Sequence, residues 1–386
     1  MRHPPTPPPR PKILILTISH GASHRRTAQA LRHALLQIRP ELTVEIIDAL
    51  AHCARRFRLY YDSYEIPLKY FPALWGLIEG LQHGSKSTGP GWLYRTGARP
   101  LFRFIQAFDP DIVIATEVGT CEIAAMLKRE HRRRFYLVGC TAGVDLDNAW
   151  AQPEVDLYPL FPIELPTDLR SLGVPSNKIL PCGTPVNPGF SFVSDRAIIR
   201  NRLNLDADLT LALILFGGTG FGNVTRIVGE LRRIKEPLQT VFISGRNRRL
   251  EMDLRKVCRD LPRSRVLGWV ENMHEWMAAA DLLVSKPGGG TVVEAVNSGL
   301  PLVAFDPLPG AERRACDLIE RQQVGLWARR AKDLAPTITA LLSNREMLGR
   351  MRERALALAR PHAAHDAAQA ILQLGADLCR NSGNTE

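Results

Sequence analysis

A run of glycines between a short apolar segment and a helical pattern is the part of this sequence best suited to bind a ligand. The segment LLVSKPGGGTVVEAVNSGLP (282–301) reads as a strand over 282–285, then a proline and three glycines, then a helix from Thr291. Glycines allow backbone N–H groups to approach a ligand, and a helix N-terminus attracts negative charge. One turn later, Glu294 is placed to accept hydrogen bonds from a sugar diol. The pattern predicts a nucleoside diphosphate site, and its alternative is an ordinary strand-to-helix turn.

Three more segments suited to a nucleotide follow predicted strands in the same half of the chain. GGTGFGN (217–223) could cup a diphosphate, GRNRRL (245–250) adds Arg246 and Asn247, and LGWVENM (267–273) offers an apolar face for a base. Ligands of open α/β sheets bind beyond the carboxyl ends of the strands. Four such segments on one sheet therefore predict a nucleotide-sugar site more strongly than any one of them alone.

Strands alternate with helices along most of the chain. Apolar runs predict strands at 12–18, 44–50, 112–117, 135–141, 211–218, 240–245, 265–270, 281–287 and 300–306. A helix is expected over 25–38, and a proline-rich stretch at 179–190 reads as a last strand followed by an interdomain linker. The alternation predicts an α/β protein with two doubly wound, Rossmann-like domains that face each other across a cleft.

The 386 residues suit two domains of ordinary size. We expect a Pro-rich tail over 1–11, rather than a signal peptide, and an N-terminal, acceptor-binding and membrane-contacting domain over 12–185. A nucleotide-sugar domain is expected over 186–360. The final stretch, 361–386, is expected to be a helix that packs back on the protein, with a short tail.

The charge and the cysteines limit the class of protein. Seven scattered cysteines with no CxxC spacing favour a reducing cytoplasm over a disulfide framework or zinc site. No apolar run is long enough for a membrane span. The net charge is +11, but the basic residues are interleaved with acids and no nucleic-acid recognition motif appears. The sequence therefore predicts a cytoplasmic protein with no nucleic-acid partner.

Residues 51–108 have the composition of a segment that lies on an anionic membrane. They hold eight Lys or Arg against three Asp or Glu, together with many large apolar side chains. The residues predicted to contact the acceptor or the membrane are Tyr70, Phe71, Trp75, Trp92 and Arg95. Peripheral attachment to the inner face of the cell membrane follows. The alternative is a helical insertion with a buried stripe and a mobile loop.

Two parts of the sequence carry a family resemblance. LGWVENMHEWMAAADLLVSKPGGGTVVEAVNSGLPLVAFDPLPGAE resembles the C-terminal domain of family 28 glycosyltransferases. The N-terminal ILILTISHGASHRRTAQAL and the hinge GTPVNPGF resemble the diacylglycerol branch, which includes monogalactosyldiacylglycerol synthases and processive diacylglycerol glucosyltransferases. The resemblance spans about 12–360. It implies the two-domain GT-B fold and the inverting transfer of a hexose from a UDP-sugar to a membrane lipid such as diacylglycerol.

The resemblance also implies roles for individual residues. Glu294 would bind the ribose of UDP, and Val270 and Met273 would frame the uracil. His24 would deprotonate the acceptor hydroxyl, although His20 is a close alternative. No metal or other cofactor is implied, because helix dipoles and backbone amides take the part of a cation. The remaining donor-binding residues are Gly217, Gly218, Thr219, Gly220, Ser285, Gly288, Gly289, Gly290, Thr291 and Glu312.

The chain departs from the family pattern at several positions. Ala22 and Ser23 stand where glycines are common. Ala311 and Ala315 replace two amide side chains that would contact the donor hexose, and such contacts can decide specificity. After the fourth strand, GCTAGVDLDNAW (139–150) offers Asp145 and Asp147 in place of the usual acidic and histidine-bearing pattern. Nucleotide binding is therefore better supported than either the hexose or the acceptor.

Other functions remain open at this point. The transferase could use a non-lipid acceptor, or the chain could be a non-catalytic homologue that binds nucleotide or lipid. A UDP-sugar 2-epimerase shares the fold but needs several acid/base carboxylates, for which Glu117 and Glu122 are the candidates.

Overall fold

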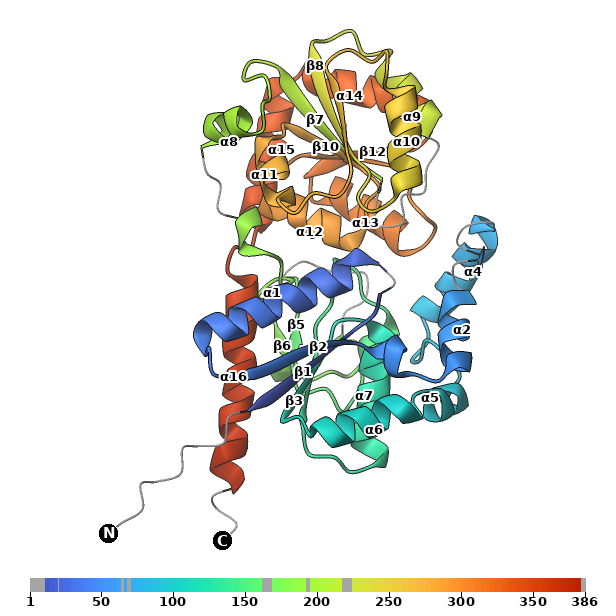
Figure 1. Cartoon of the computed structure of the whole chain (residues 1–386), viewed down its shortest axis with the longest axis vertical. Helices are drawn as coiled ribbons and strands as arrows, with labels where there is room; N and C mark the ends of the chain where they lie inside the picture. The colour runs from blue at the N-terminus through green and yellow to red at the C-terminus, as the bar shows by residue number, and fades with distance from the viewer. Residues whose placement is uncertain are drawn as a thin grey trace, which may run out of the picture.

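The structure is a computed structural model that describes residues 11–19, 21–63, 66–67, 71–161, 169–191, 195–216 and 224–382. Its two parallel sheets lie one above the other, each flanked by helices (Figure 1). The predicted α/β class and pair of doubly wound domains are confirmed. No helix in the described part of the chain is long and apolar enough to cross a membrane.

The N-terminal sheet has the strand order β2-β1-β3-β4, and all of its strands are parallel. Alternate residues of β1 belong to different cores: Leu14 and Leu16 face one hydrophobic cluster, whereas Ile13 and Ile15 face the other. This burial on both faces explains the unbroken apolar run in the sequence. The strands are β1 (Lys12–Thr17), β2 (Thr43–Asp48), β3 (Ile112–Ala115) and β4 (Tyr136–Gly139).

The C-terminal sheet is also parallel throughout, in the order β12-β11-β10-β7-β8-β9. Its strands are β7 (Thr210–Leu215), β8 (Leu238–Ile243), β9 (Ser264–Leu267), β10 (Leu282–Ser285), β11 (Leu302–Phe305) and β12 (Gly325–Ala328). The sequence analysis missed β12, a four-residue strand at the edge of the sheet. The last strand expected near 179 is only the two-residue β6 (Ile179–Leu180), which pairs with β5 (Tyr158–Pro159).

The helices that cover the sheets begin earlier than the sequence predicted at two important places. Helix α1 (Ala22–Ile38) starts at Ala22 rather than Arg25, so His24 lies in its first turn. Helix α12 (Gly289–Asn297) starts at Gly289 rather than Thr291 and includes two of the three glycines. The others around the sheets are α7 (Val118–Glu130), α8 (Arg196–Arg202), α9 (Val224–Leu231), α10 (Arg248–Val257), α11 (Met273–Ala279), α13 (Ala311–Arg321), α14 (Leu334–Leu342), α15 (Arg345–Leu358) and α16 (Ala363–Ser382).

Residues 51–108 form a helical arm on the N-terminal domain. Its helices are α2 (Arg55–Ser63), α4 (Pro72–His83), α5 (Gly91–Gly97) and α6 (Arg99–Phe108). Phe57 is fully buried and packs against Gly97, where a Cβ would lie 2.6 Å from its ring. The arm therefore has the buried stripe of a helical insertion, whereas α4 extends upward beside α13 (Figure 1).

The C-terminal helix α16 returns to the N-terminal domain and packs on α1. Its side chains Ala367, Ala368 and Ile371 are buried in the same cluster as Ile13 and Ile15 of β1. The chain therefore crosses between the domains twice, and its last helix is part of the first domain's core.

Candidate active site

The glycines at the start of α12 form one of the contacts between the two domains. A Cβ on Gly289 would lie 2.9 Å from the Cα of Gly143, which follows β4, and one on Gly290 would lie 2.8 Å from the Cβ of Ser23. A Cβ on the N-cap residue Gly288 would meet nothing within 4 Å. The missing side chains thus let the N-terminus of α12 reach the backbone of the other domain.

Glu294 faces an arginine from the opposite domain. Its side chain is 3% exposed, and its Oε1 lies 3.1 Å from Nη1 of Arg26 in α1. Burial raises the pKa of Glu294, while the charge of Arg26 opposes that rise. The carboxylate predicted to bind a ribose is therefore paired, in this structure, with a cation of the N-terminal domain.

Sequence reasoning did not single out Arg26. Its only signal is its place two residues after His24, on the same helix turn. The contact with Glu294 spans 268 residues of chain, so it depends on how the two domains meet.

A hydrogen bond to the backbone orients the ring of His24. Its Nδ1 lies 2.7 Å from the carbonyl oxygen of Thr116, just beyond β3. Because a carbonyl only accepts hydrogen bonds, Nδ1 carries the proton and Nε2 keeps its lone pair. Burial lowers the pKa of His24, so the neutral form persists to lower pH than usual. The alternative base, His20, lies outside the described residues.

The loop after β10 and the start of α13 bring further polar groups to this edge of the sheet. Glu312 accepts a hydrogen bond from the backbone N–H of Leu308 at 2.7 Å, and burial raises its pKa. Lys286, 4% exposed, lies 3.5 Å from Asp306. Sequence analysis overlooked Lys286 even though it lies within the SKPGGG motif. The Ser285 hydroxyl is fully buried and donates to the carbonyl of Lys286.

The structure describes some of the segments expected to hold the base and the diphosphate. Arg246 stacks over the Trp269 ring at 4.3 Å, whereas Asn247 caps α10 by accepting from the N–H of Leu250. Val270 and Met273 are half-buried beside the C-terminal core, and Thr291 is buried in α12. The predicted residues Gly217, Gly218, Thr219 and Gly220 lie outside the described residues.

The predicted membrane residues divide into exposed and packed ones. Phe71 and Trp92 are exposed, Trp75 is half-buried, and Arg95 is exposed but paired with Glu130 at 2.8 Å. Tyr70 lies outside the described residues. Sequence analysis did not predict how many large apolar side chains of the arm would be exposed. They also include Leu59, Ile66, Leu74, Leu77 and Leu81.

The carboxylates that an epimerase would need are used to hold the fold together. Glu117 caps α7 by accepting from the N–H groups of Gly119 and Thr120. Glu122 accepts hydrogen bonds from Ser87 and Thr88, which pins the loop between α4 and α5. Both carboxylates therefore have structural hydrogen-bond partners.

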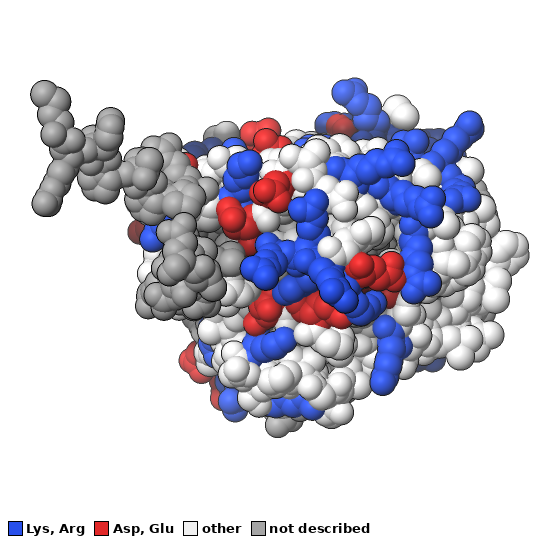
Figure 2. All heavy atoms as spheres, turned by 90° about the horizontal axis from the view of Figure 1, so that it is seen from below, with Lys and Arg blue, Asp and Glu red and all other residues white. Residues whose placement is uncertain are grey.

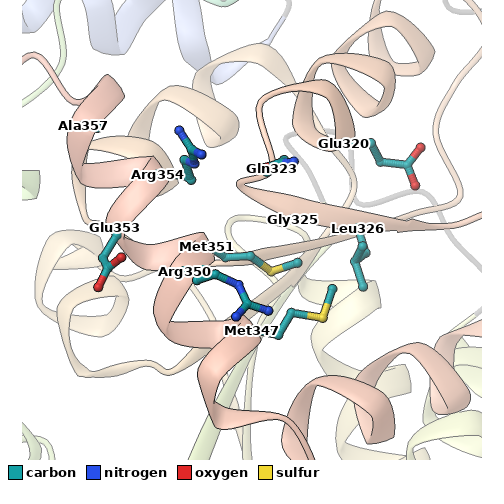
Figure 3. Close-up of a pocket in the computed structure, with 10 residues that line it drawn as sticks. All are labelled: Glu320, Gln323, Gly325, Leu326, Met347, Arg350, Met351, Glu353, Arg354 and Ala357. Carbon is teal, nitrogen blue, oxygen red and sulfur yellow. The ribbon is translucent and has the colours of Figure 1, made fainter.

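A cavity of about 620 Å³ lies away from this contact, on the C-terminal domain (Figure 3). Met347, Met351 and Leu326 give it an apolar floor, and charged side chains of α15 stand at its rim. It contains none of the predicted site residues.

Comparison with known proteins identifies the class. Residues 24–186 match the monogalactosyldiacylglycerol (MGDG) synthase family, and residues 214–344 match the glycosyl transferases group 1. Both families are glycosyltransferases, and the chain is a glycosyltransferase. The processive diacylglycerol beta-glucosyltransferase of Bacillus thuringiensis is 26% identical over 373 residues, with 94% of each chain covered. The protein of the same name from Bacillus anthracis is 27% identical over 372 residues and covers 94% of this chain and 93% of its own.

Solved structures confirm the GT-B architecture of this glycosyltransferase. MurG of Acinetobacter baumannii superposes with a TM-score of 0.62 at 16% identity, over 95% of this chain and all of that one. The UDP-GlcNAc 2-epimerase of Neisseria meningitidis gives 0.61 at 13%, over 94% of this chain and all of that one. Since transferase and epimerase fit almost equally well, these two likenesses show the fold alone.

Proposed function

We propose that this glycosyltransferase moves a hexose from a UDP-sugar to diacylglycerol, or a lipid like it, at an anionic membrane surface. The observation that carries the proposal is the placement of His24 and Arg26 on one helix turn. His24 presents an unprotonated Nε2, and Arg26 contacts the carboxylate that would bind the ribose of the donor. The names of the Bacillus relatives support the lipid acceptor and the hexose.

The proposed reaction is a single inverting displacement. The acceptor hydroxyl oxygen bonds to C1 of the sugar while its proton passes to Nε2 of His24. The bond from C1 to the β-phosphate oxygen breaks, and its electron pair leaves with UDP. The α12 N-terminus and the ammonium of Lys286 would stabilise that negative charge, so we propose that no metal ion or other cofactor is required.

The proposed donor site has two parts. Glu294 would exchange Arg26 for the ribose hydroxyls when UDP enters, and Gly288 to Thr291 would present backbone N–H groups to the diphosphate. Glu312 would face the hexose, next to Ala311, which cannot hydrogen-bond a sugar hydroxyl.

The deciding experiment measures UDP release from a panel of UDP-hexoses, with and without diacylglycerol in anionic vesicles. We expect release to require vesicles and one preferred donor. His24→Ala should lower kcat by about 10²–10⁴-fold, the usual contribution of a general base. His33→Ala, an exposed histidine on the same helix, is the matched control and should leave the rate unchanged. Equal rates in the two variants would reject His24 as the base.

Nucleotide binding is tested separately with Glu294→Gln. The amide keeps the size of the side chain but loses the charge, so we expect UDP to bind at least tenfold more weakly, about 1.4 kcal/mol. A protein that binds UDP tightly yet turns over no donor would point instead to a non-catalytic role or a different acceptor.

Membrane attachment is proposed through the exposed apolar side chains of the arm, aided by basic charge. Lys and Arg side chains predominate on the end of the molecule formed by the N-terminal domain (Figure 2). Leu77→Ser and Leu81→Ser should each weaken vesicle binding about tenfold, because burying a leucine contributes about 1.5–3 kcal/mol. Met252→Ser, exposed on α10 of the other domain, is the control and should not change binding.

A further inference from the structure

Helix α4 has two different faces. Leu74, Leu77 and Leu81 recur at three- and four-residue spacing, so they share one face, and they are 50%, 63% and 70% exposed. Each lies two residues before a member of the second set, Gly76, Glu79 and His83. Because a helix turns about 100° per residue, the two sets lie on nearly opposite faces.

The second face of α4 docks on the C-terminal domain. A Cβ on Gly76 would lie 2.8 Å from the Cβ of Pro309, and one on Gly310 would lie 2.1 Å from the carboxyl carbon of Glu79. A larger residue at Gly76 would therefore collide with Pro309, and one at Gly310 would displace the Glu79 carboxylate. The segment they touch leads directly into α13, where Glu312 of the proposed donor site lies.

Arg314 of α13 links α4 to the rest of the N-terminal domain. Its Nη1 donates to Glu79 at 3.2 Å, and its Nε donates to Asp145, in the loop after β4, at 2.9 Å. His83 of α4 lies 2.8 Å from Asp147 in the same loop. One guanidinium from the nucleotide domain thus bridges two partly buried carboxylates of the acceptor domain, and this geometry suits arginine better than lysine.

We propose that Arg314 is a positioning residue that couples the docking of α4 on a lipid surface to closure of the nucleotide domain. The inference rests on the proposed function. When the leucine face lies on a membrane, the opposite face presents Glu79 to Arg314 and holds α13 against the acceptor domain. Closure also brings α12 to His24 and Arg26, so the donor site is completed where the lipid acceptor is available.

The coupling has a thermodynamic signature. If docking and closure stabilise each other, vesicles must tighten UDP binding, and UDP must tighten vesicle binding by the same factor. Removing the contacts of Arg314 should abolish the coupling factor between UDP binding and vesicle binding. Both the UDP site and the membrane-binding face should remain.

The experiment measures the dissociation constant of UDP with and without vesicles of phosphatidylcholine, phosphatidylglycerol and diacylglycerol. In the wild type we expect vesicles to tighten UDP binding by about fivefold or more, the lower end of typical coupling. In Arg314→Gln, and equally in Glu79→Gln, the ratio should fall below about twofold. The double variant should show no further loss than Arg314→Gln alone, because the Glu79 contact already requires the Arg314 guanidinium. Arg313→Gln, the exposed neighbour on α13, should keep the wild-type ratio.

The outcomes separate this inference from the proposed function. Two outcomes would overturn the coupling alone. In the first, Arg314→Gln keeps the wild-type ratio of UDP dissociation constants without and with vesicles. In the second, that ratio is near one in a wild type that binds both ligands and turns over lipid. Failure of the wild type to bind UDP or vesicles would overturn both. Unchanged UDP affinity of Arg314→Gln in the absence of vesicles shows that the variant is folded, and Glu79→Gln tests the same contact from the other side.

Discussion

At the scale of single residues, the chemistry of this enzyme depends on backbone groups as much as on side chains. The proposed base role of His24 is supported by the Thr116 carbonyl, which fixes the tautomer, and by burial, which favours the neutral ring. Neither effect can be read from the sequence, because Thr116 lies 92 residues away. The residue type was predictable, whereas its protonation was not.

The pH dependence of kcat/KM tests this account of His24. The base must be neutral, and its pKa in the folded protein lies below the usual 6.5. Activity should therefore persist as pH falls through 6.5 and be lost only at lower pH, where the ring becomes protonated. The measurement is UDP release between about pH 5 and 8 at constant vesicle composition. A midpoint at or above 6.5 would contradict it.

The ionisation of Glu122 falls in the same pH range and must be controlled for in that measurement. Burial raises its pKa to about 7, and it holds Ser87 and Thr88 of the loop between α4 and α5. Glu122→Gln removes this titration. If the acid limb of the profile does not move in the variant, the limb belongs to His24.

At the scale of elements, the sequence predicted the sheets well and the contacts between domains poorly. Strands such as β1 and β10 are short apolar runs that end in turn residues, and these signals are local. The start of α12 was placed two residues late, because glycine at a helix start is read as loop. In the structure, Gly289 is required by the backbone of Gly143, a constraint imposed by the opposite domain.

Gly289→Ala tests that constraint. Alanine favours helix over glycine by about 1 kcal/mol, but its Cβ would lie 2.9 Å from the Cα of Gly143. We therefore expect the domains to be held apart and the radius of gyration in solution, measured with UDP present, to rise. Gly288→Ala is the matched control for compactness, since its Cβ would meet nothing within 4 Å. Equal radii for both variants would show that this contact does not limit closure.

At the scale of the whole molecule, stability and function both rest on segments that cross between domains. Arg26, Arg314 and α16 each join parts of the chain that are far apart in sequence. The Ala-, Leu- and Arg-rich composition of the tail led us to expect a helix that packs back. Its partner, the sheet face of β1 together with α1, became visible only in the fold, because an apolar stripe does not specify what covers it.

Ile371→Ala tests whether the last helix is an integral part of the first domain. Ile371 is fully buried among residues of β1 and α1, so truncation should cost about 2–5 kcal/mol. Gln373→Ala, exposed on the same helix, should change stability by less than about 0.5 kcal/mol. The measurement is amide hydrogen exchange, which reports protection at each strand. If α16 completes the core of the first domain, Ile371→Ala must lower protection in β1, more than 350 residues away. A loss of exchange protection confined to α16 would instead mean that the helix packs on the first domain without completing its core.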